Sequence, residues 1–259
     1  MALARQIDQR HLAQADGGAG VSKAGILRVN NSKKHTAPNG VISVLYKEWL
    51  AESRSKQVVV SMTVFALLII VVFSFAFDPA NHVMRNVFPG IIWVMIVFAA
   101  ILGLNRAFVG EQLNDGLTGM LMAPFEWSAI YIGKCLFHFA LLILTNVLTV
   151  PLLFLLFDFR WEGSAVLLAL VIVLGSLGLV VVGVLLAAVA ANGKGSELLL
   201  PVLLLPLLTP LLIAAVKATT IVLAGGGWSD CALWLELLLA YNIVFGFAGW
   251  LLFDYIMEG

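Results

Sequence analysis

The sequence predicts an all-α integral membrane protein with six transmembrane helices and both termini on the cytoplasmic side. Of its 259 residues, 61% are hydrophobic and 12% are charged, whereas soluble domains have roughly 45–50% apolar and about 25% charged residues. A spanning helix needs about 20 mostly apolar residues, and six segments of suitable length follow one another along the chain. They leave little sequence for a domain outside the membrane.

The chain before the first apolar run has two parts. Residues 1–40 mix Gly, Ala, Asn, Ser, Lys and His without apolar periodicity, so we expect a disordered tail. Residues 41–56 predict a cytoplasmic amphipathic helix at the membrane interface, because Val41, Leu45 and Trp49 recur every four residues. No small-residue cleavage site follows the first apolar run, which favours an uncleaved signal anchor.

Residues 57–259 predict one six-helix transmembrane domain. The expected spans are Val58–Phe77, Phe88–Leu104, Ala129–Phe157, Ser164–Ala191, Leu198–Val216 and Leu233–Tyr255. Orientation follows from the Lys/Arg bias of the short flanks. With the N-terminus inside, the cytoplasmic flanks hold Lys47, Arg54, Lys56, Arg106, Lys134 and Lys194, and the outer flanks hold Arg85, Arg160 and Lys217.

Two features interrupt this plain pattern near the C-terminus. The fifth span contains Pro201, Pro206 and Pro210, and the kinks that prolines cause either line a pathway or serve only to fit the bundle. The sequence leaves both readings open. The connection at about 217–232 has an apolar piece too short to span and a run of three glycines, so we expect a re-entrant or outer segment there.

Residues 107–124 predict a two-faced cytoplasmic helix between the second and third spans, stopped by Pro124. Glu111 and Asp115 share its polar face. The opposite, apolar face carries Leu113, Leu117, Met120 and Leu121. Such a helix either docks into a groove of a soluble partner or lies on lipid. Lipid-surface helices are usually rich in Lys and Arg, so the carboxylates favour a protein partner.

Ionisable residues inside spans are costly in lipid and are therefore candidates for function. Lys134 and His138 lie four residues apart on one face of the third span. The alternatives are that Lys134 snorkels to the interface and that His138 bonds a neighbouring carbonyl. Glu236 lies closer to the outer interface, where the cost of a charge is smaller.

Motifs for catalysis are absent from the sequence. It contains no phosphate-binding Gly-x-x-x-x-Gly-Lys-Ser/Thr loop, no His-Glu-x-x-His and no Gly-x-Ser-x-Gly. Cys135 and Cys231 are far apart and expected near opposite faces, and the net charge of +0 suggests no nucleic-acid partner. We therefore expect no catalytic residue, no metal site and no enzyme activity, so that a partner supplies any energy.

Several runs of residues resemble a known family. Six spans, an interfacial helix before the first, a carboxylate-bearing helix after the second and a broken outer segment are similar to the ABC-2 group of exporter-type permeases. Four runs narrow the resemblance to the haem exporter protein B family of the cytochrome c maturation system, over residues 42–259. They are Phe88-Pro89-Gly90-Ile-Ile-Trp93-Val, Glu111-x-x-x-Asp115-Gly116-Leu117, Met122-Ala-Pro124 and Gly133-Lys134-x-x-x-His138. The acidic residue often found in that family after Asp-Gly is here Gly119.

The resemblance implies a homodimeric permease subunit in the bacterial plasma (inner) membrane. Two copies of a separate ABC ATPase would bind ATP and Mg²⁺, and the Glu111–Pro124 residues would take the ATPase stroke. Other implied partners are a haem-handling membrane protein, a small single-span subunit and, indirectly, a periplasmic haem chaperone. Haem would be a cargo of the complex and not a cofactor, although His82, in the first outer loop, could in principle contact it.

Two other functions stay open at this point. One is an ABC-2 permease for another lipophilic cargo such as a lipid, a drug or a glycan, although spans of mostly Leu, Val, Ile and Ala offer little polar lining for one. The other is a scaffold that assembles a haem-handling complex without transporting anything.

Overall fold

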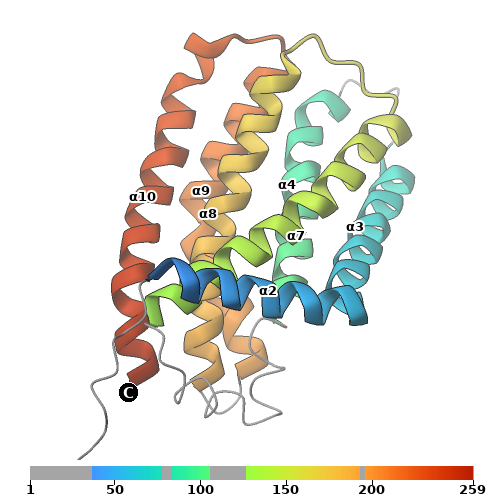
Figure 1. Cartoon of the computed structure of the whole chain (residues 1–259). Coiled ribbons are helices and arrows are strands. Elements are labelled where there is room, and N and C mark those ends of the chain that lie inside the picture. Colours follow the sequence, from blue (N-terminus) through green and yellow to red (C-terminus); the bar gives the residue numbers. More distant parts are fainter. Residues whose placement is uncertain (1–36, 78–82, 106–126, 193–195, 259) are drawn as a thin grey trace, which may run out of the picture. The chain divides into compact units, whose positions relative to one another are not determined.

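Six long helices stand side by side, and a further helix lies across one end of them, in the computed structural model (Figure 1). The structure describes residues 37–77, 83–105, 127–192 and 196–258. The long helices are α3 (Gln57–Ala76), α4 (Val83–Asn105), α7 (Trp127–Leu156), α8 (Ala165–Asn192), α9 (Ser196–Leu223) and α10 (Trp228–Glu258). All six are long and apolar enough to cross a membrane, which confirms the predicted six-span, all-α fold.

The helix that crosses the end of the bundle is α2 (Ala37–Ser55). It begins at Ala37, so the last residues of the predicted tail belong to this helix, whereas residues 1–36 lie outside the described residues. Figure 1 shows α2 and the C-terminal end of α10 at the same end of the bundle, called here the α2 end. The number of spans is even, so the chain enters the first span and leaves the last one at the same end of the bundle. The Lys/Arg bias predicts that the α2 end is cytoplasmic.

A fixed elbow joins α2 to α3. Lys56 adopts a left-handed conformation, with φ of 52°, and turns the chain from one helix into the next. The Glu52 carboxylate Oε1 accepts a hydrogen bond of 2.9 Å from the backbone N–H of Val59, one of the N-terminal donors that a helix leaves unpaired. A carboxylate at this place also opposes the positive end of the helix dipole.

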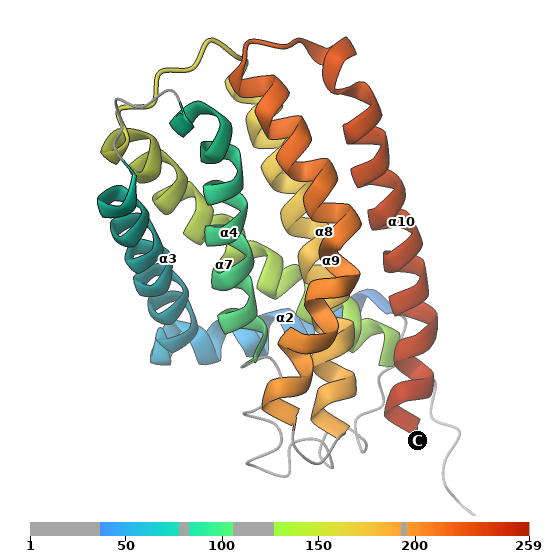
Figure 2. The same ribbon diagram turned by 180° about the vertical axis from the view of Figure 1, so that it is seen from behind.

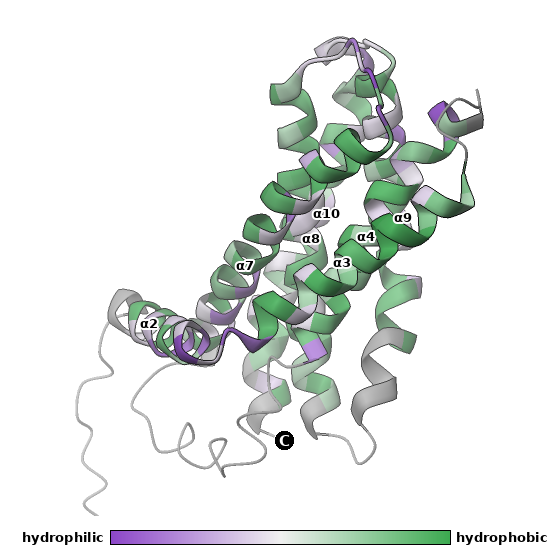
Figure 3. Cartoon of the chain, turned by 90° about the vertical axis from the view of Figure 1, so that its right-hand side faces the viewer, coloured by the Kyte–Doolittle hydropathy of each residue, from purple (hydrophilic) through white to green (hydrophobic). Residues whose placement is uncertain are grey.

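α8 occupies the middle of the bundle, in contact with α4, α7, α9 and α10 (Figure 2). Apart from its C-terminal Asn192, its one strongly polar side chain is that of Ser176, and a helix that is apolar all round suits a position among other helices. α3 instead contacts mainly α4 and α7 and exposes large apolar side chains such as Leu68 and Phe75. The hydropathy colouring of Figure 3 shows the spans as mostly hydrophobic and α2 as mixed.

Aromatic side chains hold the start of α4 against the end of α7. The Phe88 ring is fully buried and stacks on that of Phe159, with 4.1 Å between ring centroids, while Phe154 and Phe157 meet it edge to face. α4 begins at Val83, earlier than the predicted Phe88, so that Pro89 lies inside the helix.

Of the two forms expected for about 217–232, the re-entrant one is not found, and a short turn at the end opposite α2 joins the two spans. α9 continues past Val216 to Leu223, and α10 begins only a few residues later at Trp228. Thr219 and Thr220 support this extension, because each hydroxyl donates to the carbonyl four residues earlier in the helix. The segment is the end of one span, a tight turn and the start of the next.

The glycine run caps α9 and turns the chain. Gly225 has φ of 85°, the left-handed conformation that glycine adopts readily. Its N–H donates to the Val222 carbonyl and the Gly226 N–H to the Ile221 carbonyl, which is the Schellman arrangement at a helix C-terminus. Asp230 Oδ2 then accepts a 2.8 Å bond from the Gly227 N–H, as in a capping box at the start of α10.

Candidate functional site

α7 carries a line of buried polar side chains. Their spacings of about one or two helical turns place most of these groups on one helix face, which points into the protein. They are Lys134, His138, Thr145, Asn146 and Thr149. The hydroxyls of Thr145 and Thr149 donate to the carbonyls four residues before them. The sequence correctly places Lys134 and His138 on one face, and the structure turns that face toward other helices.

Lys134 forms an ion pair with α2. Its ammonium Nζ lies 3.0 Å from Glu48 Oε1, and the side chains of Lys134 and Glu48 are 0% and 18% exposed. The lysine therefore reaches another helix of the protein. A partly buried carboxylate facing a fully buried ammonium forms a charge-assisted hydrogen bond, which is stronger than a neutral one.

Gly133 lets α2 approach α7 closely. A Cβ at this position would lie 2.9 Å from Val44 Cβ and 3.4 Å from the Val41 carbonyl oxygen, so a side chain would push the helices apart. We refer to Val44, Glu48, Gly133 and Lys134 together as the α2–α7 junction. Since Glu52 also caps α3, α2 is fastened to two spans at once.

His138 lies deeper in α7, with its side chain 4% exposed. Its Nε2 has no hydrogen-bond partner among the described residues. His138 also lines a small pocket between α3, α4, α7 and α8, together with Met62, Ala100, Gly103, Leu104, Leu142 and Val180. The carbonyl partner considered from the sequence is therefore not found for Nε2, and this nitrogen remains available for an interaction.

Trp93 joins three helices. Its indole Nε1 donates a 2.9 Å hydrogen bond to Thr219 Oγ1, linking α4 to α9. Its ring covers Gly175 of α8, where a Cβ would lie 2.1 Å from a ring carbon. Pro89 is buried in the same helix, whereas a Cβ on Gly90 would meet nothing within 4 Å. Contacts within the described chain thus explain Trp93 but not Gly90.

One turn of α8 accepts hydrogen bonds from asparagine side chains of α7 and α10. Ser176 Oγ accepts a 3.1 Å bond from Asn146 Nδ2 of α7, and the Leu174 carbonyl accepts a 3.0 Å bond from Asn242 Nδ2 of α10. Sequence reasoning missed these residues. Asparagine within an apolar span is the signal that points to them, because side-chain amides in membranes bond across helices.

The predicted ATPase-coupling residues are not tested by this geometry. Glu111, Leu113, Asp115, Gly116, Leu117, Met120, Leu121 and Pro124 all lie outside the described residues, as does His82. What the structure does show is that α7 begins at Trp127 and reaches the α2–α7 junction within its first two turns. No group of three or more His, Cys, Asp or Glu that could hold a metal ion occurs in the described ranges.

Fold and buried contacts define the class: a six-span helical membrane protein whose spans are joined by buried polar side chains. The chain belongs to the CcmB protein family, whose sequence model matches residues 39–248. It is 30% identical to heme exporter protein B of Pseudomonas aeruginosa over 177 residues, which cover 68% of this chain and 79% of the relative.

Other relatives give the same result. Heme exporter protein B of Rhodobacter capsulatus is 30% identical over 58% of this chain and 68% of its own length. That of Bradyrhizobium diazoefficiens is 29% identical over 62% and 72%. With six apolar spans and bacterial relatives, the chain is a multi-pass protein of the bacterial inner membrane.

Proposed function

We propose that this chain is the membrane permease subunit of an ABC transporter complex that acts in haem delivery for cytochrome c maturation. Membership of the CcmB family and the names of the curated relatives support this function. The chain lacks a phosphate-binding loop, so a separate ATPase with bound Mg²⁺ and ATP supplies the energy. Haem is a cargo of the complex in this proposal.

The observation that carries the proposal is the α2–α7 junction. The residues proposed to receive the ATPase stroke, Glu111–Pro124, immediately precede α7 in the chain. A displacement of the start of α7 acts directly on Gly133 and Lys134, and through Glu48 on α2. Because α2 ends in the fixed elbow before α3, the same displacement reaches a second span.

The proposed assembly contains two copies of this chain and two ATPase subunits. A haem-handling membrane protein and a small single-span subunit complete it, and a periplasmic haem chaperone receives the haem. These partners come from the family resemblance, and lipid surrounds the spans. Interaction of the complex with ATP occurs only through the ATPase.

Charge reversal of the two carboxylates tests the coupling assignment. The double variant E111K/D115K is expected to lose co-purification of the ATPase in mild detergent, because its polar face then repels the groups that recognise carboxylates. The matched control is D158K, which reverses an exposed carboxylate in the connection between α7 and α8 at the end opposite α2. Normal ATPase recovery and stimulation with E111K/D115K would show that the coupling assignment is wrong.

A further inference from the structure

α2 has two apolar sides, and only one of them packs on the protein. Val44 is buried where α2 crosses Gly133 of α7, and Leu45 packs against the core. On another side of the helix, four large apolar or aromatic side chains are between 38% and 69% exposed. At 3.6 residues per turn they lie within about 100° of one another around the helix. We call them the α2 outer face, which consists of Ile42, Tyr46, Trp49 and Leu50.

The charges of α2 are sorted between its sides. Both of its carboxylates turn toward the protein, because Glu48 pairs with a lysine of α7 and Glu52 caps α3. The exposed charged residues of α2 and the elbow are all basic, and they are Lys47, Arg54 and Lys56. The first two lie about 40–60° around the helix from Leu50. The α2 outer face is therefore bordered by cations.

The depth of α2 matches the headgroup region of a bilayer. α3 follows directly after the elbow at Lys56 and has 20 residues, which is about 30 Å at about 1.5 Å per residue. The hydrocarbon core of a bilayer is also about 30 Å thick, so the elbow falls close to its boundary. Just beyond the elbow α3 exposes Val60 and Val64. The apolar exposed surface thus continues from α2 into a span.

We propose that the α2 outer face lies in the membrane interface and that the cations beside it bind the headgroups of anionic phospholipids. The apolar side of such a helix enters the boundary of the acyl chains, and its Lys and Arg residues attract anionic lipids. Trp49 and Tyr46 suit this level because their rings have an apolar body and a polar end.

Lipid matches this surface better than an acidic protein does. A bilayer supplies an apolar layer and phosphates together at the depth of the elbow, whereas an acidic protein surface would leave the four large apolar side chains without a matching partner. Between residues 37 and 56 no exposed carboxylate offsets the attraction of the cations to a negative membrane surface. The inference goes beyond the proposed function and does not depend on it.

Quenching of Trp49 fluorescence in the full chain measures this contact. The chain is reconstituted in bilayers that contain the same small share of either brominated phosphatidylglycerol or brominated phosphatidylcholine. The chain has seven tryptophans, so the signal of Trp49 is the difference between the unaltered chain and W49F. Because bromine quenches on contact, the ratio of the two quenching strengths gives the preference for anionic lipid. We expect a preference of roughly fivefold that decreases as the salt concentration rises.

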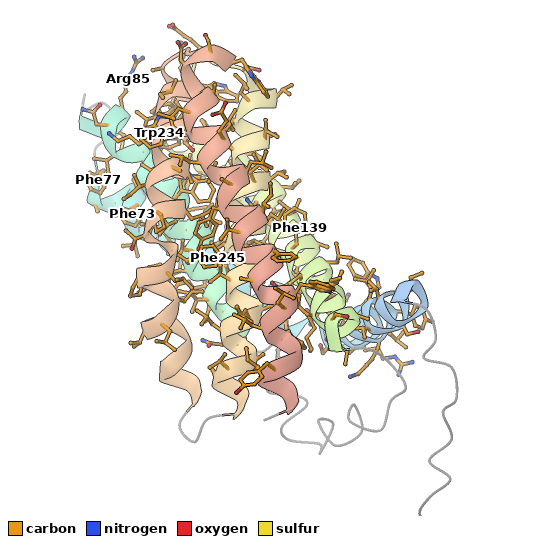
Figure 4. The ribbon with its side chains drawn as sticks, turned by 90° about the vertical axis from the view of Figure 1, so that its left-hand side faces the viewer. Phe73, Phe77, Arg85, Phe139, Trp234 and Phe245 are labelled. Carbon is orange, nitrogen blue, oxygen red and sulfur yellow. The ribbon has the colours of Figure 1, made fainter. Side chains whose placement is uncertain are left out.

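The double variant R54Q/K56Q removes two of the three cations and is expected to lower this preference to nearly one. The matched control R85Q/R160Q also removes two exposed cations and should keep the full preference. Figure 4 shows Arg85 at the end of the bundle opposite α2. Quenching by brominated phosphatidylcholine should persist in both variants, which shows that α2 is still in place.

The outcomes separate lipid from protein as the occupant of this face. Equal quenching by the two lipids in the unaltered chain, or an unchanged preference in R54Q/K56Q, would overturn the inference. The measurement is repeated on the chain co-purified with its ATPase. If Trp49 is then shielded from both brominated lipids, a protein covers the α2 outer face and the inference is wrong. If no ATPase co-purifies, the proposed function fails, whereas the lipid result with the chain alone still decides this inference.

Discussion

Replacing Glu48 with glutamine is expected to destabilise the protein more than replacing Lys134 with methionine. In E48Q the ammonium that loses its partner is fully buried, whereas in K134M the carboxylate left behind is 18% exposed and can be hydrated. Breaking a buried ion pair costs about 3–5 kcal/mol when the remaining charge has no other partner. Because Lys134 has a further interaction and Glu48 is partly exposed, we expect a loss of about 2 kcal/mol for E48Q and about 1 kcal/mol for K134M.

The free energy of unfolding in detergent, followed by tryptophan fluorescence during denaturant titration, measures these losses. The double variant E48Q/K134M removes both charges, so it is expected to lose only about 1 kcal/mol, to be more stable than E48Q alone, and to show a coupling energy of about 2 kcal/mol. R54M, at an exposed position of the same helix, is the control and should change little. Equal losses in the two single variants, or strictly additive losses in the double variant, would refute the role of this pair.

Three further predictions concern the interior of the bundle, and each uses the same unfolding measurement. G175A should lower the free energy of unfolding by about 1–3 kcal/mol because its Cβ would meet the Trp93 ring. The control G90A, with open space around its Cβ, should raise it by up to about 1 kcal/mol. Equal effects of the two substitutions would contradict the packing described. T219V should lose about 1–3 kcal/mol because it leaves the buried indole N–H without an acceptor, and an unchanged stability would show that this bond is dispensable. H138L removes a buried nitrogen without a partner among the described residues, so it should keep or raise the free energy of unfolding. If cytochrome c maturation falls in this stable variant, His138 has a functional role. If maturation is unchanged, the pocket is only structural.

The six spans could be predicted from the sequence because hydrocarbon demands continuous apolar runs, and the structure has a helix over each of them. The amphipathic pattern of α2 was also readable, but the residues that fasten it were not. Glu48 and Glu52 read as ordinary charges of an interfacial helix, whereas the structure turns both toward the protein. The partner of Glu48 is Lys134, and no local pattern connects residues so far apart in the chain.

The α9–α10 connection shows how a local signal can be misread. Three consecutive glycines suggest a chain free to turn back into the membrane, but Gly225 in the left-handed conformation is a common end of a helix. A lysine after a long apolar run suggests the end of a span, so the sequence places that end at Val216, whereas α9 continues past Lys217 to Leu223.

Haem delivery with an inactive ATPase tests the central claim most directly. The measurement is the amount of haem transferred to the periplasmic chaperone in cells that produce this chain at equal level with either the normal ATPase or one that binds ATP without hydrolysing it. A permease subunit driven by ATP hydrolysis predicts that delivery is lost with the inactive ATPase. Unimpaired delivery would contradict the permease and identify the chain as a scaffold.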